Sequence, residues 1–599
     1  NDIVSHAVVS MYSQGENQKL IAYISPTTAW LDEKVTALNE SYIENRKNVF
    51  EGQSTSENTH HDNNGVVDSD TDSSRWINSY TGQPITLDQI KEWRAGTVQR
   101  IESLRPRRLL EIGCGTGDLL YHYAAQCESV LVTDISAAVL DRHQKILQQR
   151  GWSHVELRRG DALNLGTTTP DQFDTVVMNS VVQSFPNVQY LEKVLTQLLS
   201  IMEAGGKVLL GDIRNLDLLT AHVTAIEQGH LNGQRIEVST LANRIQRRLQ
   251  QEPELLLSPT YFTQLPTRYP EISRVDILVK RGIGDNEMLR YRYDVILHKR
   301  NEQTTSCDDL SCNWYDFSTL ENLRDLLQAG IDPTFGISGI PNARIKDDFD
   351  LAEGLRHWPA NQMISPSEYA GGFSPQATEQ VQALESLLHY AEQCGYQCGV
   401  TWSQQRPDLL DVIFSRGELP PVQSRTHYSQ THLANYPQIA AMNSELSELL
   451  ESALKKQLPE YMVPNLYITL ERMPLTLNNK VDKKALPIPN ESDLRRQDYV
   501  APRNEIEQKI SQLWQELLNV SQVGIYDNFF TQGGHSLQAT RLISSIRNEL
   551  NVKIPLRSIF EYPTLEQLSQ IVTVHLVKGN RKHFQTEQET TQKLLKGDI

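Results

Sequence analysis

The sequence predicts a multidomain fold in which a doubly wound α/β region precedes a small all-α bundle. The chain has 599 residues, and single hydrophobic cores seldom grow beyond about 250–300 residues. Residues 76–300 alternate strand-like and helix-like segments, a pattern typical of a parallel sheet covered by helices. Residues 503–576 instead carry helical periodicity throughout.

Charge and composition exclude several classes of protein. The formal net charge is −17, which disfavours sequence-independent nucleic-acid binding because such binding depends on basic patches. No run of about 18 apolar residues predicts a membrane span, and no signal peptide opens the chain. We therefore expect a cytoplasmic protein without a nucleic-acid or membrane partner. Its opening residues already resemble folded structure, so we expect a piece of a longer protein.

The six cysteines predict no disulfide framework in a chain of this length. Cys307 and Cys312 are five residues apart, and Cys394 and Cys398 are four apart. A four-thiolate zinc site is conceivable, but these spacings are loose, and reduced thiols are the favoured interpretation.

The chain opens with two strand-like runs, "SHAVVSMY" and "QKLIAYIS", separated by "SQGENQ". This order predicts a β-hairpin within residues 1–26. After a short helical stretch, residues 51–74 are polar, acidic and almost free of bulky apolar groups. We expect a mobile loop there.

The central region follows in strand–helix order. Strands are expected in "RRLLEIG", "SVLVTDIS", "HVELRRGDA", "FDTVVMNSVV" and "GGKVLLGDI". Helices are expected in "DLLYHYAAQC", "AAVLDRHQKILQQRG" and "NVQYLEKVLTQLLSIM". Residues 301–434 are mixed, with helices in "TLENLRDLLQAG" and "QATEQVQALESLLHYAEQCG" and strands in "QCGVTWS" and "LLDVIFSR".

The character of the sequence changes near residue 435. "NSELSELLESALKKQLP" predicts an amphipathic helix, "NLYITLERMPLT" a strand, and Asn478-Asn479 a turn. A proline-dotted linker leads to three helical segments, "NEIEQKISQLWQELLN", "SLQATRLISSIRNEL" and "TLEQLSQIVTVHL". They predict a small helical bundle, followed by a charged tail.

A glycine-rich loop in "EIGCGTG" is the first candidate site. Gly113, Gly115 and Gly117 follow a buried strand and precede a helix, where bare backbone and a helix N-terminus can approach a nucleotide. The dinucleotide fingerprint is G-x-G-x-x-G, but here the third glycine comes one residue earlier. Glu111 lies two residues before the first glycine. This pattern resembles Rossmann-like S-adenosylmethionine-dependent methyltransferases, and Glu111 would favour a cationic ligand.

Two carboxylates stand in register with that loop. Asp134 ends the second strand, where a carboxylate can accept from both ribose hydroxyls. Asp161 follows the third strand and is placed to accept from the adenine amino group. Either one alone could be a solvated strand-end carboxylate, but together with the loop they favour a cofactor site. The predicted cofactor-binding residues are Glu111, Gly113, Cys114, Gly115, Gly117, Asp134, Ile135, Asp161, Ala162, Asn179 and Ser180.

A second site lies in "YDNFFTQGGHSLQATRL", where Ser536 starts a helix after Gly533-Gly534 and His535. Ser536 could be a simple helix cap. A hydrolase elbow needs G-x-S-x-G and is excluded, because Gln538 stands two residues after the serine. The stretch resembles the thiolation (peptidyl carrier) domains of nonribosomal peptide synthetases. That resemblance implies phosphopantetheine attachment at Ser536 by a phosphopantetheinyl transferase.

A third signal is "LPEYMVPNLYITLERMPLTLNNKVDKKALP". It resembles the end of the carboxy-terminal subdomain of adenylation domains, and the opening hairpin resembles the start of that subdomain. The resemblance implies that Lys480 is the adenylation lysine, although Asn479 replaces the usual glycine. Alternatively, Lys480 is one exposed hairpin lysine among several. No phosphate loop for ATP is found, so we expect no amino-acid activation without the missing adenylation core.

The insert between the two subdomain pieces resembles N-methyltransferase domains embedded in synthetase adenylation domains. "WINSYTGQPITLDQIKEW", "VVMNSVVQSFPNVQYL", "GGKVLLGDIRNLDLL", "NEMLRYRYDVIL" and "GISGIPNARIKDD" carry this resemblance. It implies methyl transfer from S-adenosylmethionine to the α-amine of an aminoacyl thioester on Ser536. Candidate catalytic residues, besides Lys480, are Glu287, Arg290, Tyr291, Asn179 and Gln183; Ser180, Asp212, Arg214 and Tyr80 are further candidates. Glu287 is the preferred amine-orienting carboxylate, or it pairs with Arg290 three residues on.

The resulting architecture is a Rossmann-like methyltransferase inserted in a small α+β adenylation subdomain, plus an all-α carrier domain. The adenylation subdomain is expected at 1–30 and 435–490, and linkers at 31–75 and 491–502. The methyltransferase is expected at 76–434, with its core at 76–300 and an accessory part at 301–434. The carrier is expected at 503–576 and a disordered tail at 577–599. Expected partners are the adenylation core and condensation domains. Rival functions are C- or O-methylation of the tethered group and a non-catalytic carrier scaffold; a dehydrogenase is the weakest rival, given the glycine spacing.

Overall fold

A computed structural model describes residues 3–34, 78–487 and 501–576, apart from short internal gaps of which 302–311 is the longest. The chain divides into two compact units. One contains Asn1–Val49 and Tyr436–Ile599 together with Gln250–Pro253, and the other contains Phe50–Leu249 and Glu254–Asn435. The predicted loop at 51–74, the turn at 478–479 and the tail at 577–599 lie outside the described residues.

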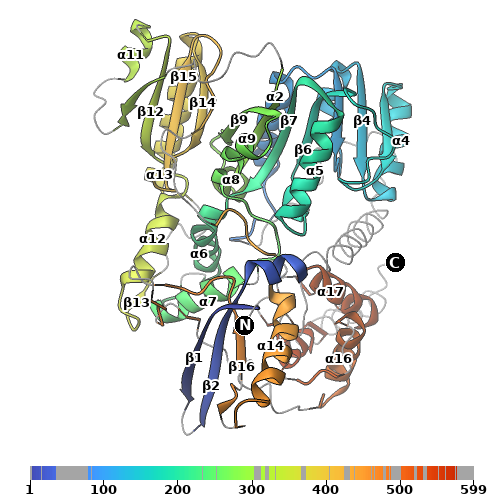
Figure 1. The fold of residues 1–599 in the computed structure, drawn as a ribbon, viewed down its shortest axis with the longest axis vertical. Coiled ribbons are helices and arrows are strands. Elements are labelled where there is room, and N and C mark those ends of the chain that lie inside the picture. The colour runs from blue at the N-terminus through green and yellow to red at the C-terminus, as the bar shows by residue number, and fades with distance from the viewer. Residues whose placement is uncertain are drawn as a thin grey trace, which may run out of the picture. The chain divides into compact units, whose positions relative to one another are not determined.

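The first unit contains a three-stranded sheet made from segments far apart in the sequence (Figure 1). The predicted hairpin is confirmed as β1 (Val4–Gln14) and β2 (Asn17–Pro26). The strand β16 (Leu466–Thr469) pairs parallel to β2, with Leu466 opposite Ile21. The predicted amphipathic helix is α14 (Ile439–Lys455), which buries Met442 and Leu446 in the same core as Ala22 and Trp30. Residues 28–34 are helical, so the expected linker cannot start at 31.

The same unit contains the predicted helical bundle. Its helices are α16 (Glu505–Leu518), α17 (Ser536–Leu550) and residues 565–573. Trp514 and Phe529 lie at the centre of the core with their ring centroids 5.0 Å apart, surrounded by leucine, isoleucine and valine side chains from the helices and loops. The all-α prediction for this part is therefore confirmed.

The second unit is built on a seven-stranded sheet in the order β5-β4-β3-β6-β7-β10-β9. Its first five strands are parallel, and β10 runs antiparallel to both β7 and β9. The bounds are β3 (Arg108–Ile112), β4 (Ser129–Asp134), β5 (Val155–Arg159), β6 (Phe173–Asn179), β7 (Met202–Arg214), β9 (Ile272–Val279) and β10 (Arg292–Lys299). The strand order reverses between β3 and β6, and ligands of such sheets bind at the carboxyl ends of the strands beside that reversal.

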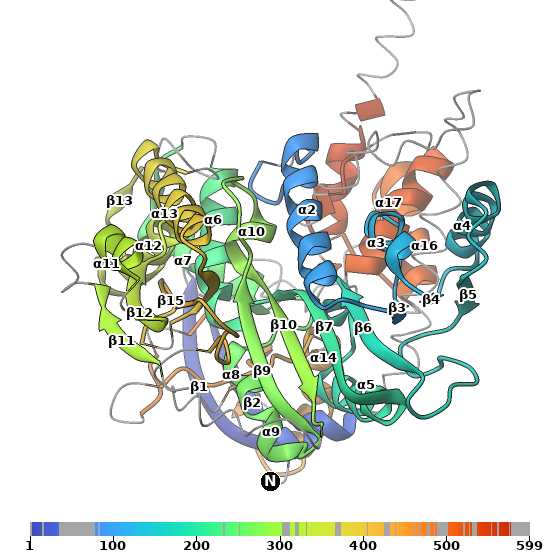
Figure 2. The same cartoon turned by 90° about the horizontal axis from the view of Figure 1, so that it is seen from above.

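Helices cover both faces of this sheet (Figure 2). The helices α2 (Leu87–Ser103) and α4 (Ala137–Arg150) lie on one face, and α5 (Val188–Ile201) lies on the other. Side-chain caps explain where they begin, since Ser136 accepts a hydrogen bond from Val139 N and Asn187 accepts one from Tyr190 N.

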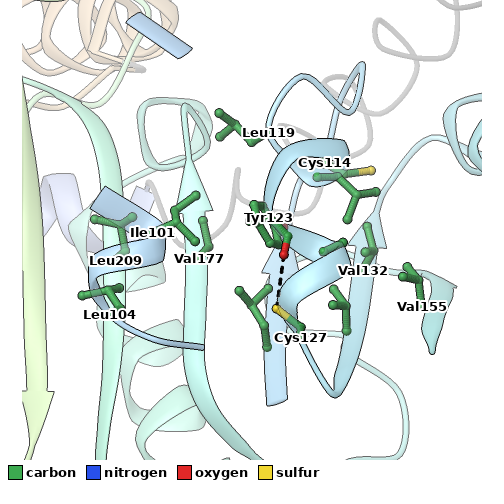
Figure 3. Packing of buried hydrophobic residues seen from close by; sticks show 14 of the residues in the cluster. Ile101, Leu104, Cys114, Leu119, Tyr123, Cys127, Val132, Val155, Val177 and Leu209 are labelled. Atoms are coloured by element: carbon green, nitrogen blue, oxygen red, sulfur yellow. Dashed lines mark hydrogen bonds between the residues drawn. The ribbon is translucent and has the colours of Figure 1, made fainter. Parts of the chain in front are cut away.

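The helix expected in "DLLYHYAAQC" is shorter than predicted: α3 (Leu120–Tyr123) ends in a 3₁₀ turn, η2 (Ala124–Gln126). Tyr123 and Ala124 are buried there, so packing rather than helical periodicity sets its length. Figure 3 shows this layer, with Ile101 of α2 and Leu104, directly after that helix, beside Val177 of β6 and Leu209 of β7.

Further helices connect β7 to β10. They are η4 (Leu216–Leu218), α6 (Leu219–His230), α7 (Val238–Gln250), α8 (Pro259–Thr263), α9 (Leu265–Arg268) and α10 (Glu287–Tyr291). A further 3₁₀ turn, η3 (Val182–Ser184), lies between β6 and α5.

The accessory residues form a second sheet in the order β11-β12-β15-β14. Its elements are β11 (Asn313–Asp316), α11 (Leu323–Ala329), β12 (Thr334–Pro341), α12 (Lys346–His357), α13 (Pro375–Gln393), β14 (Gln397–Trp402) and β15 (Leu409–Ser415). A two-stranded ribbon pairs β8 (Ile236–Glu237) with β13 (Met363–Ile364). Ile277 of β9 donates its N–H to Val422 O over 2.8 Å, so the segment after β15 joins the edge of the main sheet.

Two properties of the described residues concern membranes and metals. None of the helices in those residues is long and apolar enough to cross a bilayer. The same part of the chain contains no group of three or more histidine, cysteine, aspartate or glutamate residues that could hold a metal ion. Cys307, half of one cysteine pair, lies outside it.

Candidate functional site

The glycine loop leaves β3 in a conformation that glycine favours. Gly113, Gly115 and Gly117 have φ of 78°, 51° and 82°, in the left-handed region. A Cβ on Gly113 would lie 2.6 Å from Val181 Cγ2, and one on Gly117 would lie 2.7 Å from His143 Cε1. The loop therefore excludes larger residues and keeps its backbone bare at the strand-order reversal.

Asp134, at the end of β4, accepts a hydrogen bond from the backbone of this loop. Its Oδ2 accepts the Gly115 N–H over 3.1 Å, and its Oδ1 accepts the Ser136 N–H over 2.9 Å. The residue is buried, so it is not a solvated strand end, and burial raises the pKa of its carboxyl. Oδ2 also accepts the Cys114 thiol over 3.8 Å, so Oδ1 is the oxygen that keeps capacity for a further donor. The contact with the ribose hydroxyls stays a prediction.

Glu111 lies on β3 and faces the core. Its Oε2 accepts a hydrogen bond from Tyr123 Oη over 2.6 Å. Burial raises the pKa of this carboxyl from 4.5 to about 7, against the lowering effect of that bond. Its attraction for a cationic ligand should therefore depend on pH.

Asp161 lies in the turn after β5, and its carboxylate holds that turn together. Oδ1 accepts the N–H groups of Leu163 and Asn164 over 2.8 and 2.9 Å, and Oδ2 accepts Asn164 Nδ2 over 2.7 Å. Ala162 beside it is buried. Oδ2 retains capacity for one more donor, so the adenine contact stays a prediction. Ile135, after β4, accepts Arg159 Nε at its backbone oxygen over 3.3 Å.

Three polar side chains meet where β6 and β7 end. Asp212 Oδ2 accepts Ser180 Oγ over 2.5 Å and Asn179 Nδ2 over 3.2 Å. Ser180 and Asp212 have φ of 57° and 59°, a region that few residues other than glycine adopt. Backbone strain of this kind clusters at functional sites.

A buried ion network holds Asp212. Lys280 Nζ lies 2.7 Å from Asp212 Oδ1 and 2.8 Å from Asp294 Oδ1, and Arg100 pairs with Asp294 over 2.5 Å. Trp93 Nε1 also donates to Asp212 over 3.0 Å. Burial alone would raise the pKa of Asp212, but Lys280, Arg292 and these hydrogen bonds outweigh it and hold that pKa at about 2. Asp212 therefore stays anionic.

Gln183 and Arg214 lie beside this group. Gln183 is buried in η3 and accepts the Leu255 N–H at its backbone oxygen over 2.9 Å. Arg214, at the end of β7, pairs with Glu254 over 2.9 Å.

Glu287 lies in a second polar cluster. Its Oε2 accepts the Ser79 N–H over 3.3 Å and lies 3.9 Å from His222 Nε2, while Oε1 lies 3.9 Å from Arg292. Burial would raise the pKa of Glu287, but His222, Arg292 and the Ser79 N–H together lower it to about 2. The alternative in which Glu287 pairs with Arg290 is wrong, because the Arg290 guanidinium instead pairs with Asp285 and Asp348.

Arg290 lies inside an aromatic cage. Its guanidinium carbon is 5.2 Å from the ring centroids of Tyr80 and Phe373 and 5.5 Å from that of Tyr291. The Tyr291 hydroxyl donates to Asp348, and burial raises the pKa of Tyr291 well above its usual value. The structure thus brings four candidate residues, Tyr80, Glu287, Arg290 and Tyr291, into one cluster.

The two polar clusters occupy the same edge of the sheet. Because β10 is antiparallel to β7, its first residue, Arg292, lies opposite Arg214 at the carboxyl end of β7. The helix α10, with Glu287, immediately precedes Arg292. The carboxyl ends of the parallel strands, where ligands of such sheets bind, therefore carry the glycine loop, Asn179 and Glu287.

Sequence reasoning missed His222, whose ring stacks on Tyr291 with centroids 4.5 Å apart. It also missed Lys280 and Asp348, which complete the two ion networks. No motif marks these residues, since they come from separate elements and only the fold brings them together.

The first unit holds the other two predicted residues. Lys480 is exposed next to Val481, which bridges to Leu475; its role in adenylation stays a prediction. Ser536 is the first residue of α17, as predicted.

Comparison with known families identifies two domains. Residues 110–208 match a methyltransferase domain, and residues 508–572 match a phosphopantetheine attachment site. The first match spans the glycine loop and Asn179, and the second spans Ser536. The chain matches a segment of nonribosomal peptide synthetases.

Several synthetases are similar to this chain over most of its length. The chain is 32% identical to CymA of Salinispora arenicola, named as a probable nonribosomal peptide synthetase, over 84% of this chain and 6% of that protein. It is 30% identical to the chondramide synthase of Chondromyces crocatus over 96% of this chain and 15% of that one. Identity to the cyclosporin synthetase of Tolypocladium inflatum is 27% over 97% of this chain and 4% of that one. The chain thus spans a small part of these relatives.

Solved structures resemble the two domains separately. The N-methyltransferase NodS of Bradyrhizobium japonicum, in complex with S-adenosyl-L-homocysteine, covers 35% of this chain and 88% of its own at 16% identity and a TM-score of 0.25. A prototype peptidyl carrier domain covers 12% of this chain and 99% of its own at 44% identity and a TM-score of 0.12. The domain matches agree with the predicted cofactors, S-adenosylmethionine for the first domain and phosphopantetheine for the second.

Proposed function

We propose that this chain transfers the methyl group of S-adenosylmethionine to the α-amine of an aminoacyl thioester carried by phosphopantetheine on Ser536. The observation that supports an amine acceptor is the buried carboxylate of Glu287. It is anionic at neutral pH because its pKa lies at about 2. A buried anion among the rings of Tyr80, His222 and Tyr291 suits an ammonium or amine group.

The residues at the sheet edge fit S-adenosylmethionine. The left-handed glycines keep the loop free of side chains on the side of its nucleoside, and Asp134 Oδ1 retains capacity for a hydroxyl donor. When bound, S-adenosylmethionine supplies an electrophilic methyl carbon attached to a positively charged sulfur.

The chain must then present a neutral amine to that carbon. A carboxylate with a pKa of about 2 is too weak a base to take a proton from an ammonium at neutral pH. Glu287 is therefore an orienting group, which holds an N–H of the amine and directs the nitrogen lone pair away from itself. Most of the acceleration comes from holding the two reacting atoms in line.

The carrier domain supplies the acceptor in high local concentration. A thioester on Ser536 reaches the methyltransferase as a tethered group rather than by free diffusion. The methylated aminoacyl group then stays attached for peptide-bond formation by condensation domains. Lys480 takes part in amino-acid activation only together with an adenylation core.

The test is methyl transfer in cis. The full chain is loaded at Ser536 with several aminoacyl-phosphopantetheine groups by a phosphopantetheinyl transferase, S-adenosylmethionine is added, and the protein mass is followed. We expect one added methyl, located on nitrogen after hydrolysis and fragmentation, and none in the Ser536→Ala chain. A methyl on carbon or oxygen would replace this proposal with its rival, and absence of transfer with every aminoacyl group would favour a scaffold.

A further inference from the structure

Asn179, the last residue of β6, has an amide whose orientation is chemically fixed. Its Nδ2 donates to Asp212 Oδ2 over 3.2 Å and to Ser180 Oγ over 3.3 Å. Ser180 Oγ in turn donates its proton to the same carboxylate. Because an ionised carboxylate only accepts hydrogen bonds, the NH₂ end of Asn179 must face Asp212. Its carbonyl oxygen is therefore the end left for another group.

That carbonyl oxygen is buried and accepts no hydrogen bond from the residues that the structure describes. A buried acceptor without a donor costs about 1–3 kcal/mol, so native structures rarely keep one. Its position at the carboxyl end of β6, next to the strand-order reversal, is where a ligand lies in this type of sheet. An N–H group brought by a ligand at this sheet edge would supply the missing donor.

Gly211 on β7 is what allows the Asn179 oxygen to lie where it does. A Cβ on Gly211 would stand 2.0 Å from Asn179 Oδ1 and 2.9 Å from its Cγ. Asn179 and Gly211 are direct partners in the pairing of β6 with β7. Any side chain at position 211 would therefore push the amide away.

Asp212 is itself held rigidly. Lys280 and Trp93 contact its carboxylate, and its backbone N–H donates to Asp294 over 2.9 Å. Its φ of 59° and that of Ser180 keep the two strand ends in a strained conformation. Because Asp212 is held in this way, the Asn179 amide that donates to it is held as well, and the Asn179 carbonyl oxygen has a fixed position.

We propose that Asp212 and Gly211 are positioning residues that hold the Asn179 carbonyl oxygen as the acceptor for an amine N–H at the methyl-transfer centre. The amine is either the α-amine of the tethered aminoacyl group or the amino group of the methyl donor, which share this chemistry. The inference rests on the proposed function, since it requires a methyl-transfer centre at this sheet edge.

The test compares Asn179→Ala, Gly211→Ala and Asp212→Asn in the full chain, with Gly96→Ala as the matched control. A Cβ on Gly96 would meet nothing within 4 Å. Two quantities are measured: the affinity for S-adenosylmethionine by calorimetry, and the single-turnover rate of methylation of the loaded carrier at saturating donor. 5′-Methylthioadenosine resembles S-adenosylmethionine without its amino-acid part. The affinity for it therefore shows whether the nucleoside part of the site is still folded in each variant.

We expect Asn179→Ala and Gly211→Ala to lower one of the two quantities by about 10- to 100-fold, and Asp212→Asn to lower the same one by a smaller factor. If the rate falls and the donor affinity holds, the acceptor amine is the partner. If the donor affinity falls, the amino group of the donor is the partner. Binding of 5′-methylthioadenosine stays unchanged in either case.

The inference is overturned if Asn179→Ala changes neither quantity, or if it weakens 5′-methylthioadenosine equally, which would make Asn179 part of the scaffold. It is also overturned if Gly211→Ala behaves like Gly96→Ala. The product that the wild-type chain forms distinguishes failure of this inference from failure of the proposed function. An N-methylated product from wild type with unaffected variants refutes only the inference, whereas a C- or O-methylated product refutes the proposed function.

Discussion

Replacing Glu111 with glutamine should stabilise the methyltransferase unit above neutral pH. In the folded protein, burial holds the pKa of Glu111 at about 7, compared with 4.5 for an ordinary glutamate. Below pH 4.5 both states bind the proton and the carboxyl makes no difference. As the pH rises toward 7, the unfolded state ionises first, so the folded state loses stability relative to it. The full loss is about 3 kcal/mol, from 1.36 kcal/mol for each pH unit between the two pKa values.

Glutamine keeps the shape and can accept the same hydrogen bond from Tyr123 Oη, but it has no charge to bury. Scanning calorimetry from pH 5 to 9 measures the melting temperature of the methyltransferase unit. Its unfolding transition is identified as the one whose melting temperature S-adenosylmethionine raises. We expect the melting temperature of Glu111→Gln to exceed that of wild type by several degrees at pH 8, with the gap closing toward pH 5. Glu156→Gln, at an exposed position on β5 of the same sheet, is the matched control. A gap that does not change with pH, or a less stable Glu111→Gln at pH 8, would refute the reasoning.

Three further results are expected. Affinity for S-adenosylmethionine, measured by calorimetry, should rise between pH 6 and 8 as Glu111 ionises next to a cationic ligand, and Glu111→Gln should remove that rise. Asp348→Asn should destabilise the unit by about 3–5 kcal/mol in denaturant titrations, because it leaves the Arg290 charge buried with Asp285 alone; Asp350→Asn, on an exposed pair of the same helix, should change little. Tyr80→Phe should leave the melting temperature unchanged or raised, since the buried Tyr80 hydroxyl has no hydrogen-bond partner among the described residues, but it should lower the methylation rate if that hydroxyl contacts the aminoacyl group.

The sequence predicted the parts of the fold that repeat a local pattern. Strands β3 to β7 and helices α4 and α5 follow from apolar runs, caps and glycines. The hairpin of β1 and β2 and the strand β16 also followed from local patterns, whereas their place in one split subdomain followed from a resemblance. The helix after the glycine loop came out too long because "DLLYHYAAQC" continues the helical pattern, whereas burial of Ala124 turns the chain into 3₁₀ geometry.

The residues of the site likewise divide into those that a local pattern predicts and those that only the fold brings together. The glycine loop, Asp134 and Asn179 were predicted because they stand at fixed offsets from strand ends. The partners of Glu287 and Arg290 were not, since His222 comes from α6 and Asp348 from α12. The sequence left a pair of Glu287 with Arg290, three residues on, as the alternative, but Arg290 is buried against Asp348 of α12 instead.

The two networks keep their carboxylates anionic for different purposes. Asp212 uses its oxygens on Lys280, Trp93, Ser180 and Asn179, so it has little left to offer a ligand and acts through Asn179. Glu287 has looser partners, with His222 and Arg292 both 3.9 Å away, so an incoming N–H group can compete for its oxygens. A tightly held carboxylate that fixes a neutral acceptor, beside a loosely held one that can bind an amine directly, gives two oxygen acceptors at one sheet edge. Where the acceptor amine is the partner of both oxygens, its two held N–H groups leave its lone pair pointing in a single direction.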